Sequence, residues 1–153
     1  MITPHEHYPK LAKVIGVSDL YFKREDLHPY GSHKGRSIPF MIDYYYEKSD
    51  REFAISSSGN AALAVVLYVK ELNAKNKEPI NLDIFVGNNT APHKLERLKE
   101  LTDENIRILI KERPLQALTQ AVREGKRSLR QSTDDIALIG YESLARELAE
   151  IKG

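Results

Sequence analysis

The chain has 153 residues, enough for one compact domain and too few for a second full one. Its 23 basic and 22 acidic residues leave a net charge of +1, which favours neither a nucleic acid nor a membrane surface as a partner. It has no cysteine, which excludes a disulfide framework and a thiolate metal site. The first residues lack the basic and apolar regions of a signal peptide, so the expected location is cytoplasmic.

Apolar residues recur with periods that predict alternating strands and helices. A short strand at 20–22 and a helix over 34–47 come first. The expected strands that follow lie at 53–56, 82–86, 106–110 and 136–139, and the expected helices run over 61–72, from Pro92, from Pro114 and over 141–151. This order predicts an α/β fold: a Rossmann-like, three-layer domain in which an open parallel sheet of about four strands has helices on both faces.

Small polar residues follow the strand at 53–56 and open the next helix. Ligands of parallel sheets bind outside the carboxyl ends of the strands, so Ser56 to Asn60 are expected at the mouth of a site. The N–H groups and hydroxyls of Ser57, Ser58, Gly59 and Asn60 suit a carboxylate. By themselves these residues fit an ordinary helix N-cap with no ligand better than a binding site. Ser57 lacks the G-x-S-x-G surroundings of a hydrolase nucleophile.

Two motifs stand a short helix apart. The first begins with Lys23-Arg24-Glu25-Asp26-Leu27 and ends with Gly31-Ser32-His33-Lys34-Gly35-Arg36, and the second is Ser56-Ser57-Ser58-Gly59-Asn60. Together they resemble the fold-type II pyridoxal-phosphate (PLP) enzymes, the family of threonine synthase, serine/threonine dehydratase, cysteine synthase and tryptophan synthase β. The resemblance extends over essentially the whole chain, including Gly140-Tyr141-Glu142-Ser143, where the family's chain crosses back to its large domain.

The resemblance implies specific roles for these residues. Lys34 would be the catalytic lysine that holds PLP as an imine, and Asn60 would bond the phenolic oxygen of the cofactor. Ser57, Ser58, Gly59 and Asn60 would bind the substrate carboxylate in the cleft that Lys34 lines. Ser32 and His33 would contact the cofactor phosphate, although either could equally be part of the local structure.

The chemistry of Lys34 agrees with this assignment. An amine reacts with an aldehyde only when it is unprotonated, a state that burial or a neighbouring cation such as Arg36 favours. Gly31 and Gly35 would let the backbone approach a flat ring. PLP then acts as an electron sink at the substrate Cα. The alternative, an ordinary solvated helix lysine, would hold for a lysine outside this motif. The five histidines have no metal-ligand spacing, so no metal site is expected.

The family's second half supplies a glycine-rich phosphate cup, whereas the eight glycines here are spread thinly. We therefore expect an N-terminal segment, 1–30, that packs on a large domain outside this sequence, a small α/β domain, 31–140, and a returning helix, 141–153. The expected function is the N-terminal part of a PLP-dependent lyase or synthase that catalyses β- or γ-elimination or replacement on an amino acid, as in threonine synthase and dehydratase. The alternatives are a non-catalytic binding or assembly module and one subunit of a split enzyme. The isolated chain is expected to bind PLP weakly and to pair as a homodimer or with a separate large-domain chain.

Overall fold

The computed structural model describes residues 1–75 and 78–151, and its central feature is a parallel sheet. Four strands lie in the order β5-β4-β3-β6, and every neighbouring pair is parallel. The strands are β3 (Glu52–Ser56), β4 (Asn81–Gly87), β5 (Ile106–Lys111) and β6 (Arg127–Ser128). The predicted α/β class and four-stranded sheet are confirmed.

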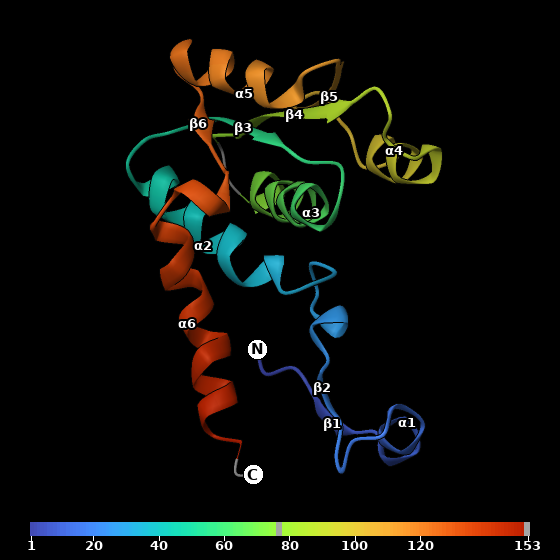
Figure 1. Ribbon diagram of the computed structural model, residues 1–153. Helices are drawn as coiled ribbons and strands as arrows, with labels where there is room; N and C mark the ends of the chain where they lie inside the picture. The colour runs from blue at the N-terminus through green and yellow to red at the C-terminus, as the bar shows by residue number, and fades with distance from the viewer. Residues whose placement is uncertain (76–77, 152–153) are drawn as a thin grey trace.

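Helices cover both faces of this sheet (Figure 1). One face carries α5 (Pro114–Arg123), and the other carries α3 (Asn60–Lys75), with α2 (Lys34–Glu47) packed behind it and α4 (Pro92–Lys99) beside it. Because α3 lies between the sheet and α2, it is apolar on most sides, and Val65, Val66 and Val69 are fully buried. The helix predicted over 34–47 has the same bounds in the structure.

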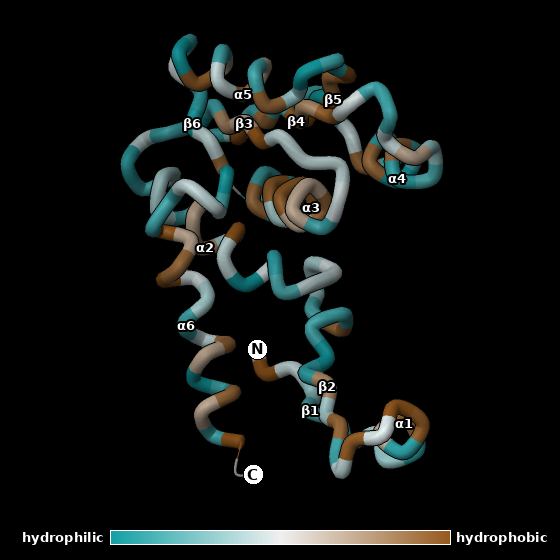
Figure 2. The backbone as a smooth tube through the Cα atoms, in the orientation of Figure 1, coloured by the Kyte–Doolittle hydropathy of each residue, from teal (hydrophilic) through white to brown (hydrophobic). Residues whose placement is uncertain are grey.

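The N-terminal residues form a separate small unit. Strands β1 (His5–His7) and β2 (Tyr21–Lys23) pair antiparallel, α1 (Pro9–Ile15) connects them, and the single turn η1 (Glu25–Leu27) leads on toward α2. This unit lies beside the C-terminal half of α6 (Ile136–Ala149) at the lower end of Figure 1. Exposed apolar residues lie on both, among them Val14 of α1 and Leu148 of α6. Figure 2 shows hydrophobic stretches along α1 and α6.

The strand predicted at 136–139 is wrong, because these residues form the first turn of α6. Asp134 starts this helix by accepting the N–H of Ile136 with its side chain at 3.0 Å. The apolar run then divides between two faces, with Ala137 buried and Leu138 exposed. The fourth strand is instead β6. Leu129, the residue that follows it, is buried in the core. The expected division at residue 140 falls within α6.

Two polar residues make up β6, so no apolar pattern marked it. They pair with Phe53 and Ala54 of β3, and the next residue, Leu129, donates its N–H to the carbonyl of Ala54 at 2.9 Å. Leu129 is fully buried and fixes the segment against the core. The chain then enters the short turn η2 (Gln131–Thr133), which lies beside the carboxyl end of β3.

No helix in the described ranges, 1–75 and 78–151, is long and apolar enough to cross a membrane.

Candidate active site

A pocket opens at the point where the order of the strands reverses. From β3 the chain moves outward through β4 to β5 and then returns to β6 on the other side of β3. Crevices at such reversals are the usual ligand sites of open parallel sheets. The pocket there has a volume of about 230 Å³ and is lined by Lys34, Ile55, Ser56, Ser57, Ala61, Leu129, Arg130, Gln131 and Ser132.

Lys34 begins α2 and contributes its half-buried side chain to this pocket. Its Nζ donates a hydrogen bond of 3.5 Å to the phenol oxygen of Tyr141. Among the described residues, no carboxylate lies within ion-pair distance of Nζ. Within the described part of the chain, the amine is therefore not held in an ion pair beside the pocket.

The two residues before Lys34 shape the start of α2. Ser32 is buried, and its hydroxyl accepts the N–H of Lys34 at 3.2 Å. The ring of His33 stacks on Tyr141 with 6.1 Å between centroids. Desolvation of the ring lowers the pKa of His33, and the nearby positive charge of Lys34 lowers it further. Contact of either residue with a cofactor phosphate stays a prediction.

The serine-rich loop is divided between two pockets. Ser57 lines the pocket of Lys34, whereas Ser58, Gly59 and Asn60 line a second pocket of about 190 Å³. The remaining walls of the second pocket come mainly from α4 and include Leu63, His93, Lys94, Arg97 and Leu98. The adjacent residues Ser57 and Ser58 thus line different pockets.

Two N–H groups of the loop are already used. Ser57 donates its N–H to the carbonyl of Phe85 at 3.2 Å, and Gly59 donates its N–H to Ser57 Oγ at 3.3 Å. The first-turn N–H groups of α3, beginning with Asn60, have no acceptor within the helix. These groups, rather than the N–H of Ser57, are the donors that the loop can offer to an anion.

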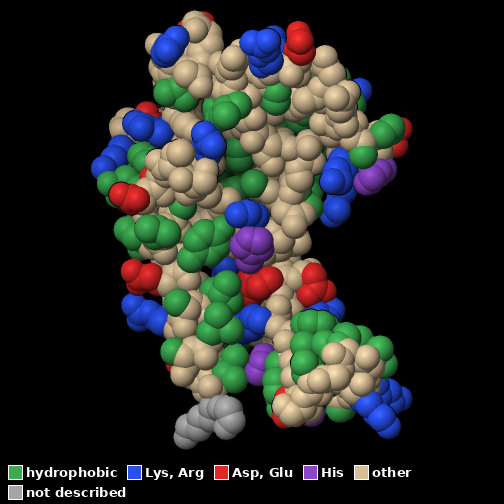
Figure 3. Space-filling view, viewed as in Figure 1, with side chains coloured by type: hydrophobic (Ala, Val, Ile, Leu, Met, Phe, Trp, Pro, Cys, Tyr) green, Lys and Arg blue, Asp and Glu red, His purple; other side chains and the backbone are tan. Residues whose placement is uncertain are grey.

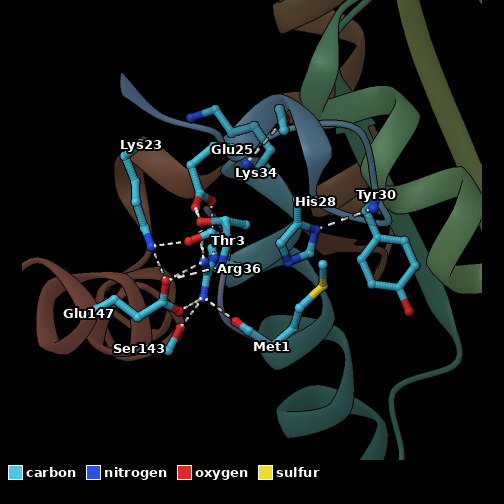
Figure 4. Close-up of polar contacts among 11 residues, drawn as sticks. Met1, Thr3, Lys23, Glu25, His28, Tyr30, Lys34, Arg36, Ser143 and Glu147 are labelled. Carbon is cyan, nitrogen blue, oxygen red and sulfur yellow. Dashed lines mark hydrogen bonds and ion pairs between the residues drawn. The ribbon is translucent and has the colours of Figure 1, made fainter. Parts of the chain in front are cut away.

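Arg36 does not act as a free cation beside Lys34. Its guanidinium lies in a buried cluster, bonded to Glu25 at 2.9 Å and to Glu147 at 2.5 Å (Figure 4). Lys23 joins the cluster through Glu147 and through the carbonyl of Thr3, the latter at 2.6 Å. The hydrogen bond from Arg36, followed by that from Lys23, lowers the pKa of Glu147 to about 2. Arg36 is therefore not the unpaired neighbouring cation that the sequence suggested, because two carboxylates balance its charge.

The glycines of the first motif serve the protein's own packing. Gly31 has φ +79°, a conformation that favours glycine, and a Cβ there would lie 3.0 Å from Leu63. Gly35 packs directly against the ring of His28, leaving no room for a side chain. His28 is itself buried, and its desolvation, followed by the charge of Arg36, lowers its pKa.

Sequence reasoning missed three residues near Lys34: Arg130, Gln131 and Tyr141. Arg130 and Gln131 line the pocket of Lys34, and Tyr141 reaches the lysine from α6. Figure 3 shows Lys, Arg and His side chains gathered at the waist of the molecule, between the sheet and the N-terminal unit. The motif Gly140 to Ser143 was recognised, but nothing in its residue types indicated that Tyr141 points at the lysine.

Comparison with known proteins identifies the family. The family model described as "Pyridoxal-phosphate dependent enzyme" matches residues 2–153, and the chain therefore belongs to this family. A threonine synthase of Methanosarcina acetivorans is 33% identical over 66 residues, which cover 43% of this chain and 16% of that protein. The L-serine dehydratase/L-threonine deaminase of Bos taurus is 30% identical over 118 residues, which cover 71% of this chain and 34% of that protein.

Solved structures share the fold over almost the whole chain. A pyridoxal 5'-phosphate-dependent aspartate racemase superposes with a TM-score of 0.80 at 20% identity, covering 98% of this chain and 45% of that one. Threonine deaminase isoform 2 of Solanum lycopersicum gives a TM-score of 0.76 at 24% identity, covering 99% of this chain and 43% of that one. The chain thus spans less than half of these structures and at most about a third of the two curated relatives.

Proposed function

We propose that this chain supplies the lysine-bearing part of a PLP-dependent enzyme that catalyses β- or γ-elimination or replacement on an amino acid, in the manner of threonine synthase or serine/threonine dehydratase. The observation that carries the proposal is the Lys34 amine, which lies in the pocket where the strand order reverses and has no carboxylate partner among the described residues. When bound, PLP supplies an electron sink for charge that develops at the substrate Cα.

The residues present fit the attachment of the cofactor. Lys34 would hold it covalently, and Ser57 lines the same pocket. Asn60 stands at the start of α3, where it would bond the phenolic oxygen, and the first-turn N–H groups of α3 would orient a substrate carboxylate. Ser32 and His33 would lie nearest the phosphate.

The phosphate itself has no glycine-rich cup in this chain. No two of the eight glycines stand closer than four positions apart, so no glycine-rich loop is available to surround a phosphate. Residues outside this sequence, in the same protein or in a second chain, would have to supply that loop. Retention of the fold without catalysis is the remaining alternative.

A titration with PLP tests the proposal directly. The chain is mixed with PLP, absorbance is recorded near neutral pH, and borohydride reduction followed by peptide mapping locates the label. We expect the label at Lys34 and its loss in Lys34→Ala, with weak binding overall. Lys94→Ala is the matched control, because Lys94 lines the neighbouring pocket and should leave the label unchanged. Stronger labelling of any other lysine than of Lys34 would refute the assignment.

A further inference from the structure

We infer that Tyr141 is a positioning residue for Lys34: its phenol oxygen holds the lysine amine in one direction at the pocket shared with Ser57. The inference rests on the proposed role of Lys34. It adds two residues to the candidate site, Tyr141 from α6 and Gln131 from η2. Neither residue belongs to the lysine motif or to the serine motif.

The phenol oxygen of Tyr141 accepts two hydrogen bonds. Lys34 Nζ donates one at 3.5 Å, and the amide nitrogen of Gln131 donates the other at 3.0 Å. The same amide nitrogen also donates to the hydroxyl of Ser37 in α2. Both amide hydrogens of Gln131 are therefore engaged. Gln131 thereby links the phenol oxygen of Tyr141, the acceptor for Lys34, to Ser37 of α2.

The ring of Tyr141 is fixed as well. The ring of His33 stacks on one side of it, with an interplanar angle of 30°. Gly140, the preceding residue, lets α6 approach α2 closely: a Cβ at this position would lie 2.5 Å from Ser37 Cα and 3.0 Å from the carbonyl oxygen of Arg36. This close approach brings the phenol to the first turn of α2, where Lys34 stands.

A fixed acceptor matters because a lysine ammonium sits on a flexible four-carbon stem. The pocket walls around Lys34 include the apolar side chains of Ile55, Ala61 and Leu129, which offer no hydrogen bond to direct it. Capture of a large planar aldehyde requires the amine to point in a defined direction, whereas capture of a very small aldehyde does not. The ratio of capture of the large aldehyde to capture of the small one therefore measures how well the Lys34 amine is positioned, separately from its general reactivity.

The experiment uses the full 153-residue chain without cofactor. Wild type, Tyr141→Phe, Gln131→Ala and the double variant are each reacted with PLP or with formaldehyde, reduced with borohydride and mapped. At Lys34 the PLP-to-formaldehyde ratio should fall about fivefold in Tyr141→Phe, the effect of one hydrogen bond. Gln131→Ala should lower the ratio too, and the double variant should fall no further than Tyr141→Phe, because Gln131 acts through the phenol. Circular dichroism checks folding, and the ratio at exposed Lys94 serves as the internal control.

The outcomes separate the two ideas. If the PLP-to-formaldehyde ratio at Lys34 is the same in wild type and in Tyr141→Phe, with Lys34 labelled in both, the positioning role is overturned and the proposed function is left intact. A wild-type chain that takes formaldehyde but no PLP at Lys34 overturns both. If Tyr141→Phe does not fold, Gln131→Ala decides, because it keeps the ring and its stacking on His33; a ratio equal to that of wild type then overturns the role of Tyr141.

Discussion

The guanidinium of Arg36 and the carboxylate of Glu147 lie 2.5 Å apart, although 111 positions separate the two residues. Their side chains are 3% and 10% exposed, so the pair is shielded from water. Glu25 and Thr3 bond the same guanidinium, and the cluster therefore joins α2, α6 and the N-terminal unit.

Removal of Glu147 should destabilise the chain strongly. Loss of one partner of a buried ion pair leaves the other charge uncompensated, and Glu147→Ala should lower the free energy of unfolding by about 3 kcal/mol. Glu142→Ala is the control, because the pair of Glu142 with Arg146 on the same helix is exposed and should contribute about 0.3–0.5 kcal/mol. Urea denaturation measures both. Similar losses for the two variants would show that the cluster does not stabilise the fold.

Acid should weaken the same cluster, because protonation of Glu147 removes its ion pairs. The pKa of Glu147 is about 2 in the folded chain and about 4.5 when unperturbed, so the folded state binds fewer protons in this range. Its stabilising effect is present above the unfolded value and is lost as the pH falls from about 5 toward 2. The difference in urea midpoint between wild type and Glu147→Gln should therefore shrink from pH 6 to pH 3. A constant difference would contradict the lowered pKa.

Gly140→Ala should be destabilising, against the usual helix preference. Alanine normally stabilises a helix interior by about 1 kcal/mol relative to glycine. Here the added Cβ would lie 2.5 Å from the backbone of Ser37, and such overpacking costs about 1–3 kcal/mol. Gly59→Ala, where no atom lies within 4 Å, is the control. Thermal unfolding gives the sign, and a higher midpoint for Gly140→Ala would mean that the helices separate freely.

The chain alone should self-associate through α6 and the N-terminal unit. Leu138, Ile139 and Leu148 of α6 are 66%, 46% and 47% exposed, and Phe22 of β2 is 40% exposed. Apolar surface of this kind favours a partner, most simply a second copy of the chain. Sedimentation should show a dimer that Leu138→Glu weakens, while Thr119→Glu on exposed α5 should have no effect. A monomer at all concentrations would count against this surface.

Asn60→Ala should leave PLP attached to Lys34 but change its absorbance, because the phenolic oxygen loses a donor. Asn89→Ala is a suitable control, since Asn89 is exposed in the turn after β4. The spectrum of the PLP-loaded chain is the measurement, and borohydride mapping confirms that the label stays at Lys34. Identical spectra for the Asn60 variant and wild type would remove Asn60 from the cofactor's surroundings.

Local patterns predicted the sheet strands and helices where apolar residues recur with one clear period. The helix at 34–47 was correct at both ends. The run at 136–139 failed because four consecutive apolar residues do not distinguish a strand from a helix. Strand β6 could not be found, since backbone pairing with Phe53 and Ala54 defines it and its own residues are polar.

The candidate site was predictable only where its residues lie in the two motifs. Lys34 and Ser57 do share a pocket, as the motifs indicated. The separation of Ser58 to Asn60 into the neighbouring pocket depends on how α4 packs, which the motif does not encode. The pairing of Arg36 with Glu147 and the approach of Tyr141 to Lys34 are tertiary contacts across more than 100 positions, and no local signal specifies such a pair.

The contact between Thr3 and Glu147 also bears on the order in which the chain folds during synthesis. The N–H of Thr3 and the carboxylate of Glu147 are 144 positions apart, so they can meet only after a ribosome has released Glu147. Strands β3 and β4 lie within residues 52–87 and leave the ribosome earlier. Closing a long loop costs entropy that only completed contacts offset. We therefore expect β3 and β4 to pair on the nascent chain before the contact between Thr3 and Glu147 can form.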